Sequence, residues 1–199
     1  SDNGPWLSYG DHSGSSGIYR EGKGTTWEGG VRVPSIIKFP NGLKPRIINE
    51  PVMGIDWMPT FASITDSKLS KNKIDGKNIW PLLSGETYKS PHKKLYFYYR
   101  VNELHSIRMD EWKIHFKRTY RSLNGKNGGK DGMPVKYDMN LLEKNELYNL
   151  KNDPEERNNV YDDFPEIVLM MEKLGIKARE ELGDNLTDVI GKENREARK

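Results

Sequence analysis

The sequence predicts an α/β chain that ends in a small antiparallel sheet packed by a C-terminal helix. Eight glycines lie in the first 34 residues, which indicates a segment made mostly of loops. Three β-like stretches then follow residue 93, the first of them with four aromatic residues. Beyond residue 164, apolar residues recur at intervals of three or four positions, which is typical of one face of a helix.

Two elements are expected between the glycine-rich segment and the sheet. Residues 31–39 (VRVPSIIKF) read as a strand closed by the Pro-Asn-Gly turn at 40–42. Apolar residues at nearly helical spacing over 52–64 predict a helix that starts near Asp56, with Pro59 in its first turn. The following stretch, up to residue 94, is expected to be mainly loop.

The predicted sheet contains a hairpin. Asp110-Glu111 is a candidate tight turn between the β-like stretches 105–109 and 112–117, and a further strand is expected over 94–100. Residues 118–136 hold four glycines, five Lys or Arg and one acidic residue, which predicts a long exposed loop.

The C-terminal part is expected to close the sheet and cover it. Residues 146–150 predict a short strand and 152–156 a turn. Apolar residues between Phe164 and Leu182, spaced 4, 3, 4 and 4 apart, predict an amphipathic helix. Its polar face and the tail Lys192–Lys199 are expected to be solvated.

Composition excludes several classes of protein. Hydrophobic residues make up 34% and the mean hydropathy is -0.85, and no apolar run approaches the ~18 residues of a membrane span. With 32 Lys and Arg against 29 Asp and Glu, the net charge of +3 gives no argument for nucleic acid. Without cysteine there is no disulfide, thiolate metal site or thiol nucleophile.

The first motif that could carry chemistry is Asp2-Asn3-Gly4. A carboxylate and an amide carbonyl are hard oxygen donors suited to calcium or magnesium, and the glycine permits a sharp turn that points both one way. Taken alone, the triplet is more often an ordinary turn. Because the chain opens on this motif without a starting Met, we expect it to be a piece of a longer protein.

The second motif is the stretch Gly22–Pro34 (GKGTTWEGGVRVP). A lysine between two glycines can approach a sulfate or phosphate oxyanion closely, although a solvated lysine in a flexible turn is the simpler reading. The glycine spacing does not match a P-loop. Glu28 and Arg32 lie four residues apart and are expected to form a structural ion pair.

Together the two motifs, 21 residues apart from Asp2 to Lys23, resemble the second half of a type I sulfatase of the arylsulfatase A-like branch. The resemblance covers nearly the whole chain in order. The glycine-lysine motif is its specific part, and further matching stretches are Asp56-Trp57-Met58-Pro59-Thr60, Pro81-Leu82-Leu83-Ser84-Gly85, Trp112-Lys113-Ile114-His115-Phe116 and Glu146-Leu147-Tyr148-Asn149-Leu150, followed by Asp153-Pro154-Glu155-Glu156.

The resemblance implies a site that this chain holds only in part. Asp2 and Asn3 match two ligands of the family's Ca²⁺ ion, and Lys23 matches the lysine that binds the sulfate ester. In the family the nucleophile is a formylglycine made within a Cys/Ser-x-Pro-x-Arg motif, and that motif is absent here. We therefore expect the formylglycine and the other calcium ligands to lie in a missing N-terminal part, and the isolated chain to be inactive.

The implied fold is the C-terminal part of an alkaline-phosphatase-like sulfatase. Residues 1–90 would end the catalytic α/β domain, and 91–199 would form the C-terminal subdomain. The implied partner is a sulfate ester, expected to be a sulfated glycan, with no nucleic acid and no membrane span. The compartment cannot be read from the sequence, and the resemblance favours a periplasmic, secreted or lysosomal location.

Candidate substrate contacts are His12, Arg118 and Arg121, from the glycine-rich segment and from the basic loop; solvated loop residues are the alternative for each. His115 is expected to be a packed structural residue, and the other histidines show no partner pattern. Two other functions stay open: a phosphoester or phosphonate hydrolase of the same superfamily, and a non-catalytic carbohydrate-binding module.

Overall fold

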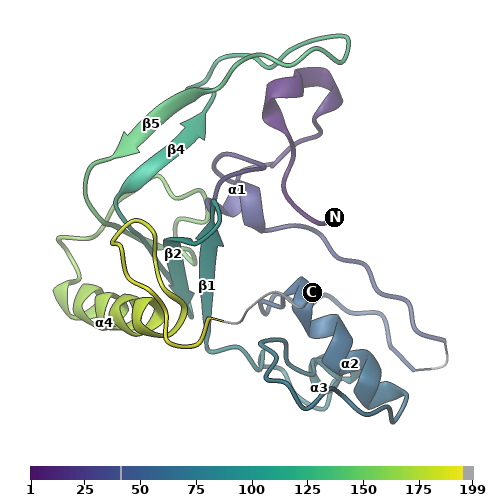
Figure 1. Cartoon of the computed structure of the whole chain (residues 1–199). Helices are drawn as coiled ribbons and strands as arrows, with labels where there is room; N and C mark the ends of the chain where they lie inside the picture. Colours follow the sequence, from purple (N-terminus) through teal and green to yellow (C-terminus); the bar gives the residue numbers. More distant parts are fainter. Residues whose placement is uncertain (41, 195–199) are drawn as a thin grey trace. The chain divides into compact units, whose positions relative to one another are not determined.

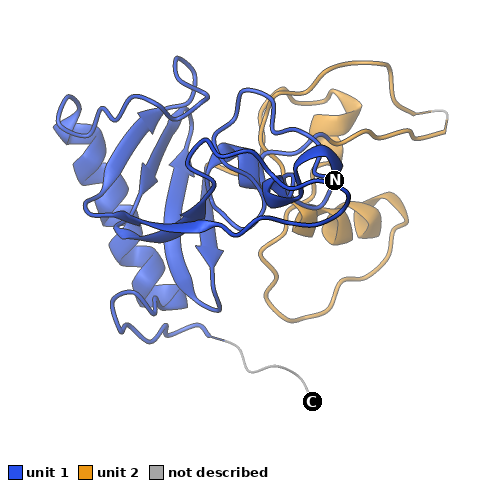
Figure 2. Ribbon diagram, turned by 90° about the horizontal axis from the view of Figure 1, so that it is seen from above, with its two compact units in different colours: residues 1–34, 94–199 blue, residues 35–93 orange. Residues whose placement is uncertain are grey.

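The computed structural model describes residues 1–40 and 42–194, and the chain divides into two compact units (Figure 2). The first, here the sheet unit, combines residues 1–34 with 94–199, and the second comprises residues 35–93. The glycine-rich N-terminal segment therefore belongs to the same unit as the C-terminal sheet. The expected division near residue 90, between the end of a catalytic domain and a C-terminal subdomain, stays a prediction.

The sheet unit is built on a four-stranded antiparallel sheet in the order β1-β2-β3-β6; Figure 1 labels β1 and β2 of this sheet. The β2–β3 hairpin turns at Asp110, which has a left-handed φ of 52°. The predicted strands and hairpin are confirmed within one or two residues at each end. The strands are β1 (Lys94–Tyr99), β2 (Glu103–Met109), β3 (Trp112–His115) and β6 (Glu146–Asn149).

The predicted C-terminal helix is confirmed as α4 (Pro165–Leu182), which packs against the sheet through a shared apolar cluster. Leu104, Ile107 and Ile114 of the sheet are fully buried with Met171 of the helix. Gly175 allows the close approach, because a Cβ there would lie 2.7 Å from the Phe116 ring. Burial of these side chains is the main favourable term holding sheet and helix together.

The expected loop over 118–136 is wrong in its first part, which forms β4 (Arg118–Ser122) paired with β5 (Asp138–Leu142). Residues 118, 120 and 122 are buried and 119 is exposed, which is the alternation of a strand. The glycine and charge content of the whole stretch concealed this period. The connection between the strands packs against the N-terminal segment, where the Gly129 amide donates to the Ser8 carbonyl at 2.8 Å.

Short helical segments complete the sheet unit. They are η1 (Leu7–His12) and α1 (Glu28–Val31). The expected strand over residues 31–39 is wrong: Val31 ends α1, and residues 32–39 have no regular structure. Ile36 in this stretch is 97% exposed. Strand formation needs a neighbouring strand for its hydrogen bonds, and a local pattern does not supply one.

Residues 35–93 form a small helical unit. It contains η2 (Gly54–Asp56), α2 (Trp57–Ile64) and α3 (Trp80–Ser84). Helix α2 confirms the predicted helix with Pro59 in its first turn, whereas α3 interrupts a stretch expected to be mainly loop. No helix of the described residues is long and apolar enough to cross a membrane. Residues 192–194 of the expected solvated tail are exposed, and 195–199 lie outside the described residues.

Candidate functional site

The backbone brings the two sequence motifs side by side. The Gly4 amide donates to the Gly30 carbonyl at 3.0 Å, and the Lys23 amide donates to the Pro5 carbonyl at 2.8 Å. The chains approach so closely that a Cβ on Gly4 would lie 1.8 Å from the Gly29 carbonyl oxygen. The Asp2–Pro5 segment and the Gly22-Lys23-Gly24 turn, here the Lys23 turn, are therefore neighbours in the sheet unit.

Asp2 and Asn3 offer oxygen atoms at this site. Asp2 is exposed and Asn3 is half-buried, and the Asn3 side-chain amide donates to the Asp2 carboxylate at 2.6 Å. A carboxylate with an amide carbonyl beside it suits a hard cation such as Ca²⁺. Among the described residues, however, no group of three or more His, Asp or Glu side chains could hold a metal ion. The donor chemistry fits calcium, but the described chain supplies only part of a ligand shell.

Lys23 sits in a turn held from two sides. Besides the bond from its amide to Pro5, its carbonyl accepts hydrogen bonds from the Arg121 guanidinium, from Nε at 3.1 Å and from Nη2. Gly24 follows with a left-handed φ of 85°. The Lys23 ammonium lies 4.9 Å from the centroid of the Trp6 ring, within cation–π range.

The structure separates the three candidate substrate contacts. Arg121 joins Lys23 directly, whereas His12, at the end of η1, is exposed and lies 3.8 Å from Asp11. Arg118 is only 2% exposed. Its guanidinium donates to the backbone carbonyls of His105 and Phe116. Arg118 therefore makes its hydrogen bonds inside the sheet unit, and a contact with substrate stays a prediction.

Behind the Lys23 turn, Trp27 anchors the motif in the core. It is fully buried, and its ring stacks on His115 at a centroid distance of 3.9 Å. The Arg20 guanidinium lies over the same ring, 3.6 Å from its centroid. Tyr120 of β4 and Tyr148 of β6 meet the indole edge to face. The tryptophan thus ties the motif to both sheets of the unit.

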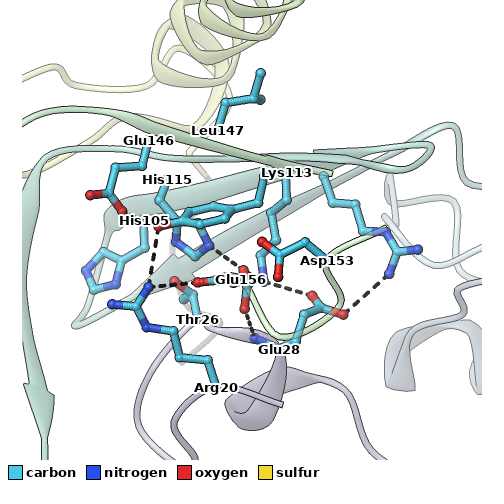
Figure 3. Close-up of polar contacts among 12 residues, drawn as sticks. Arg20, Thr26, Glu28, His105, Lys113, His115, Glu146, Leu147, Asp153 and Glu156 are labelled. Carbon is cyan, nitrogen blue, oxygen red and sulfur yellow. Dashed lines mark hydrogen bonds and ion pairs between the residues drawn. The ribbon is translucent and has the colours of Figure 1, made fainter. Parts of the chain in front are cut away.

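A buried ionic cluster surrounds Glu28, the residue that follows Trp27; Figure 3 shows Glu28 with Lys113, His115 and Glu156. Lys113 Nζ lies 2.8 Å from Glu28 Oε1 and 3.1 Å from Glu156 Oε1. The second Glu156 oxygen accepts from the Glu28 amide at 2.6 Å. All three side chains are at most 1% exposed. Buried charges need opposite charges and hydrogen bonds close by. Lys113 serves both carboxylates, and Arg32 and Arg108, each 3.7 Å from Glu28 Oε2, add positive charge beside the oxygen of Glu28 that makes no hydrogen bond within the described residues.

His115 completes this cluster as a neutral imidazole. Arg118 Nη2 lies 2.8 Å from its Nδ1, and because arginine is only a donor, Nδ1 must accept. The proton is therefore on Nε2, which donates to Glu156 Oε1 at 2.7 Å. Burial and the charges of Arg118 and Lys113 hold the pKa of His115 well below its usual value. Burial likewise lowers the pKa of Arg118, to about 10.

The sequence reasoning found only part of this cluster. The structural role expected of His115 is confirmed, and Glu28 lies 3.7 Å from Arg32 as expected. Neither Lys113 nor Glu156 was predicted to belong to the cluster. Lys113 lies on the same face of its strand as His115, and the two-residue alternation of a strand would have indicated this. Partners 41 and 85 residues apart in the chain leave no local signal.

Two protein families match parts of this chain. The family described as "C-terminal region of aryl-sulfatase" matches residues 90–195, more than half of the chain. A second family, "N-sulphoglucosamine sulphohydrolase, C-terminal", matches residues 16–124. The second match includes the Lys23 turn.

Individual relatives point the same way. Arylsulfatase A from Bos taurus is 34% identical over 170 residues, covering 83% of this chain and 33% of the relative. Steryl-sulfatase from Mus musculus is 37% identical over 121 residues, covering 60% of this chain and 19% of the relative. This chain thus spans about a third or less of the length of these relatives.

Solved structures share the fold. The PsFucS1 sulfatase from Pseudoalteromonas sp. superposes with a TM-score of 0.73 at 27% identity, covering 90% of this chain and 35% of that one. The structure titled Ps i-CgsB in complex with k-i-k-neocarrahexaose gives 0.66 at 26% identity, covering 89% and 34%. With the family match and the arylsulfatase A relative, these findings show that the chain belongs to the sulfatase family, as a C-terminal portion.

Proposed function

We propose that this chain is the C-terminal part of a calcium-dependent sulfatase that hydrolyses sulfate esters of a carbohydrate. The observation that carries the proposal is the backbone pairing of the Asp2–Pro5 segment with the Lys23 turn. A sulfated glycan is favoured as substrate because structural neighbours include one solved with a neocarrahexaose and one titled for glycosaminoglycan metabolism.

Lys23 is assigned to the sulfate group. Its ammonium is a compact positive charge that hydrogen-bonds sulfate oxygens and stabilises the negative charge that grows as the ester bond breaks. Asp2 and Asn3 would supply two of the oxygen ligands of Ca²⁺. When bound, the ion would add a second positive charge facing the sulfate oxygens.

The ionic cluster gives this site a rigid base. Glu28, five residues beyond Lys23, is fixed by Lys113 through its carboxylate and by Glu156 through its amide. Trp27 fills the core next to it. A turn anchored in this way keeps the lysine at a defined place, which is where preorganised charge contributes to catalysis.

The remaining machinery would come from a part of the sulfatase outside these 199 residues. Two oxygen ligands fall well short of the about 6 to 8 that calcium takes. We therefore expect the 199-residue chain alone to bind calcium weakly and to lack turnover. Robust hydrolysis of an aryl sulfate by the isolated chain would contradict this part of the proposal.

The test uses the full-length sulfatase that contains this chain, assayed on an aryl sulfate. Lys23→Ala is expected to lower kcat/KM by about 100-fold or more, the scale of losing one charge-stabilising donor. Exposed Lys151 provides the matched control, and Lys151→Ala should stay within about twofold. An unchanged kcat/KM for Lys23→Ala would refute the assignment.

The same protein assayed on paired aryl sulfate and aryl phosphate substrates separates the sulfatase from a phosphoester hydrolase. A preference for the sulfate supports the proposal, and a preference for the phosphate contradicts it. Glycan binding that survives replacement of Asp2, Asn3 and Lys23, in a protein without hydrolysis, would instead identify a carbohydrate-binding module.

A further inference from the structure

The side chain of Arg121, in β4, binds the backbone of the Lys23 turn. Nε lies 3.1 Å from the Lys23 carbonyl oxygen, and Nη2 donates to the same oxygen. Lys23 and Arg121 are 98 residues apart in the sequence. Two of the donors of this guanidinium are therefore committed to a protein backbone atom, which argues against a primary role as a substrate contact.

The turn is shaped to receive this guanidinium. A Cβ on Gly24 would lie 2.0 Å from Arg121 Nη2, so the arginine occupies the space that a side chain would need. Gly24 also has a left-handed φ of 85°, which residues other than glycine rarely adopt. The Gly-Lys-Gly spacing is thus accounted for by contact with Arg121 as well as by any approach of a ligand.

The peptide groups on both sides of the Lys23 Cα are anchored. Its amide donates to Pro5, which follows the Asp2-Asn3-Gly4 motif, and its carbonyl accepts from Arg121. The side chain therefore starts from a backbone that cannot rotate freely. Its ammonium lies over the Trp6 ring, also in the N-terminal segment.

Arg121 is itself held in place. Its guanidinium lies 4.7 Å from the centroid of the Tyr137 ring, and its residue pairs with Met139 in the β4–β5 ladder. The next residue makes a second hydrogen bond to the same segment, because Ser122 Oγ donates to Glu21 Oε1 at 2.6 Å. Strand β4 thus contacts the lysine turn through two consecutive side chains.

We propose that Arg121 is a positioning residue for Lys23, rather than a substrate contact. This inference rests on the proposed role of Lys23 in binding the sulfate group. The planar fork of arginine delivers two donors to one carbonyl oxygen, and a lysine in its place keeps the charge but loses that geometry.

The first test compares Arg121→Lys and Arg121→Gln in the full-length sulfatase on an aryl sulfate. Both are expected to lower kcat by about tenfold or more, because small displacements of a catalytic group are costly, with KM changed less than about threefold. Arg157→Gln, at a largely exposed arginine, is the matched control and should be neutral. If Arg121→Lys keeps the activity of the parent, or if the two variants raise KM without lowering kcat, Arg121 contacts the substrate through its charge and the inference is wrong.

A double-mutant cycle sharpens the result. In the Lys23→Ala background, Arg121→Gln should cost less than about twofold further, because a residue that acts through Lys23 has nothing left to position. If Arg121→Gln lowers kcat by the same factor in the Lys23→Ala background as in the parent, the two residues act independently and the inference is wrong.

A second measurement needs no activity and uses the 199-residue chain. Hydrogen exchange at the Lys23 amide, which is bonded to Pro5, is expected to be about tenfold faster in Arg121→Gln than in the parent and in Arg157→Gln. Unchanged exchange would overturn the inference even if Lys23→Ala proved inactive. Conversely, faster exchange in Arg121→Gln together with full activity of Lys23→Ala would refute the proposed function. The finding that Arg121 holds the Lys23 turn would still stand.

Discussion

The sheet unit and the unit of residues 35–93 differ in how they bury their side chains. The sheet unit contains two apolar clusters and an ionic cluster in which every charge has a partner. Residues 35–93 bury few large apolar side chains, chiefly Ile79, Leu82 and Leu83. In the same unit Ile36 is 97% and Ile47 88% exposed.

The smaller unit has a buried polar centre at Asp56. The fully buried Asp56 carboxylate accepts hydrogen bonds from the Met53 and Lys77 amides, both at 2.8 Å. It also lies 2.8 Å from His92 Nε2. Charged groups inside a densely packed core therefore stabilise the sheet unit, whereas the buried Asp56 carboxylate of residues 35–93 has little apolar packing around it. Each unit should therefore respond differently to substitution.

The largest effect is expected from Glu156→Ala, which takes one of two carboxylates from buried Lys113 and leaves His115 Nε2 and the Glu28 amide without their acceptor. Removing one partner from a buried charge cluster costs about 3–5 kcal/mol, measured as the free energy of unfolding in urea. The neighbouring Glu155, which pairs with Arg157 near the surface, is the control, and Glu155→Ala should cost less than about 1 kcal/mol. Equal losses would show that the cluster does not stabilise the sheet unit.

The next effect concerns the smaller unit alone. Asp56→Ala removes the acceptor of two part-buried backbone amides, those of Met53 and Lys77, and of buried His92. The loss at His92 is expected to cost about 1–3 kcal/mol, and the losses at the part-buried amides less, because water can replace the lost acceptor there. Hydrogen exchange should then speed up over α2 and α3 while α4 keeps its protection. Loss of protection in α4 to the same degree would contradict the separation of the two units.

A moderate effect is expected on acidification. Burial lowers the pKa of His105 to about 4, and its hydrogen bond to Glu103 only partly opposes this. A histidine in the unfolded chain has a pKa of about 6.5, so below that pH the unfolded chain binds a proton that His105 in the native sheet unit does not bind. The stability of the sheet unit should therefore fall as the pH drops from 7 to 5, and its Tm, measured over this pH range, should fall with it. His105→Gln should reduce this drop, and an unreduced drop would exclude His105 as its source.

The smallest effect tests the exposed isoleucines. Ile36→Val should change the free energy of unfolding by less than about 0.5 kcal/mol. The same substitution at the fully buried Ile107 should cost about 0.5–1.5 kcal/mol. A comparable loss at both positions would mean that Ile36 is packed in solution.

The sequence predicted the elements whose information is local. The hairpin at Asp110-Glu111 and the helix Pro165–Leu182 follow from turn residues and from helical spacing, and both are present. The strand expected over 31–39 failed for lack of a partner, although its residues are as β-like as those of β2. Strand β4 was missed because the glycines and charges of the following loop masked its alternation.

The candidate site divides in the same way. Asp2, Asn3 and Lys23 were identified from a resemblance, and the structure places their segments in contact. The residues that hold these segments include Glu156, 128 residues from Glu28, and Arg121, 98 residues from Lys23. Their roles depend on how the chain folds back on itself, which no local pattern records.

The most direct test of the account is kcat/KM on an aryl sulfate for Gly4→Ala in the full-length sulfatase. A Cβ at Gly4 would lie 1.8 Å from the Gly29 carbonyl oxygen and force the Asp2-Asn3 segment away from the lysine turn. Gly54→Ala is the matched control, since a Cβ there meets nothing within 4 Å. We predict a loss of about tenfold or more for Gly4→Ala in protein that remains folded, and no change for Gly54→Ala. Equal activity of the two variants would contradict the claim that the two motifs form one site.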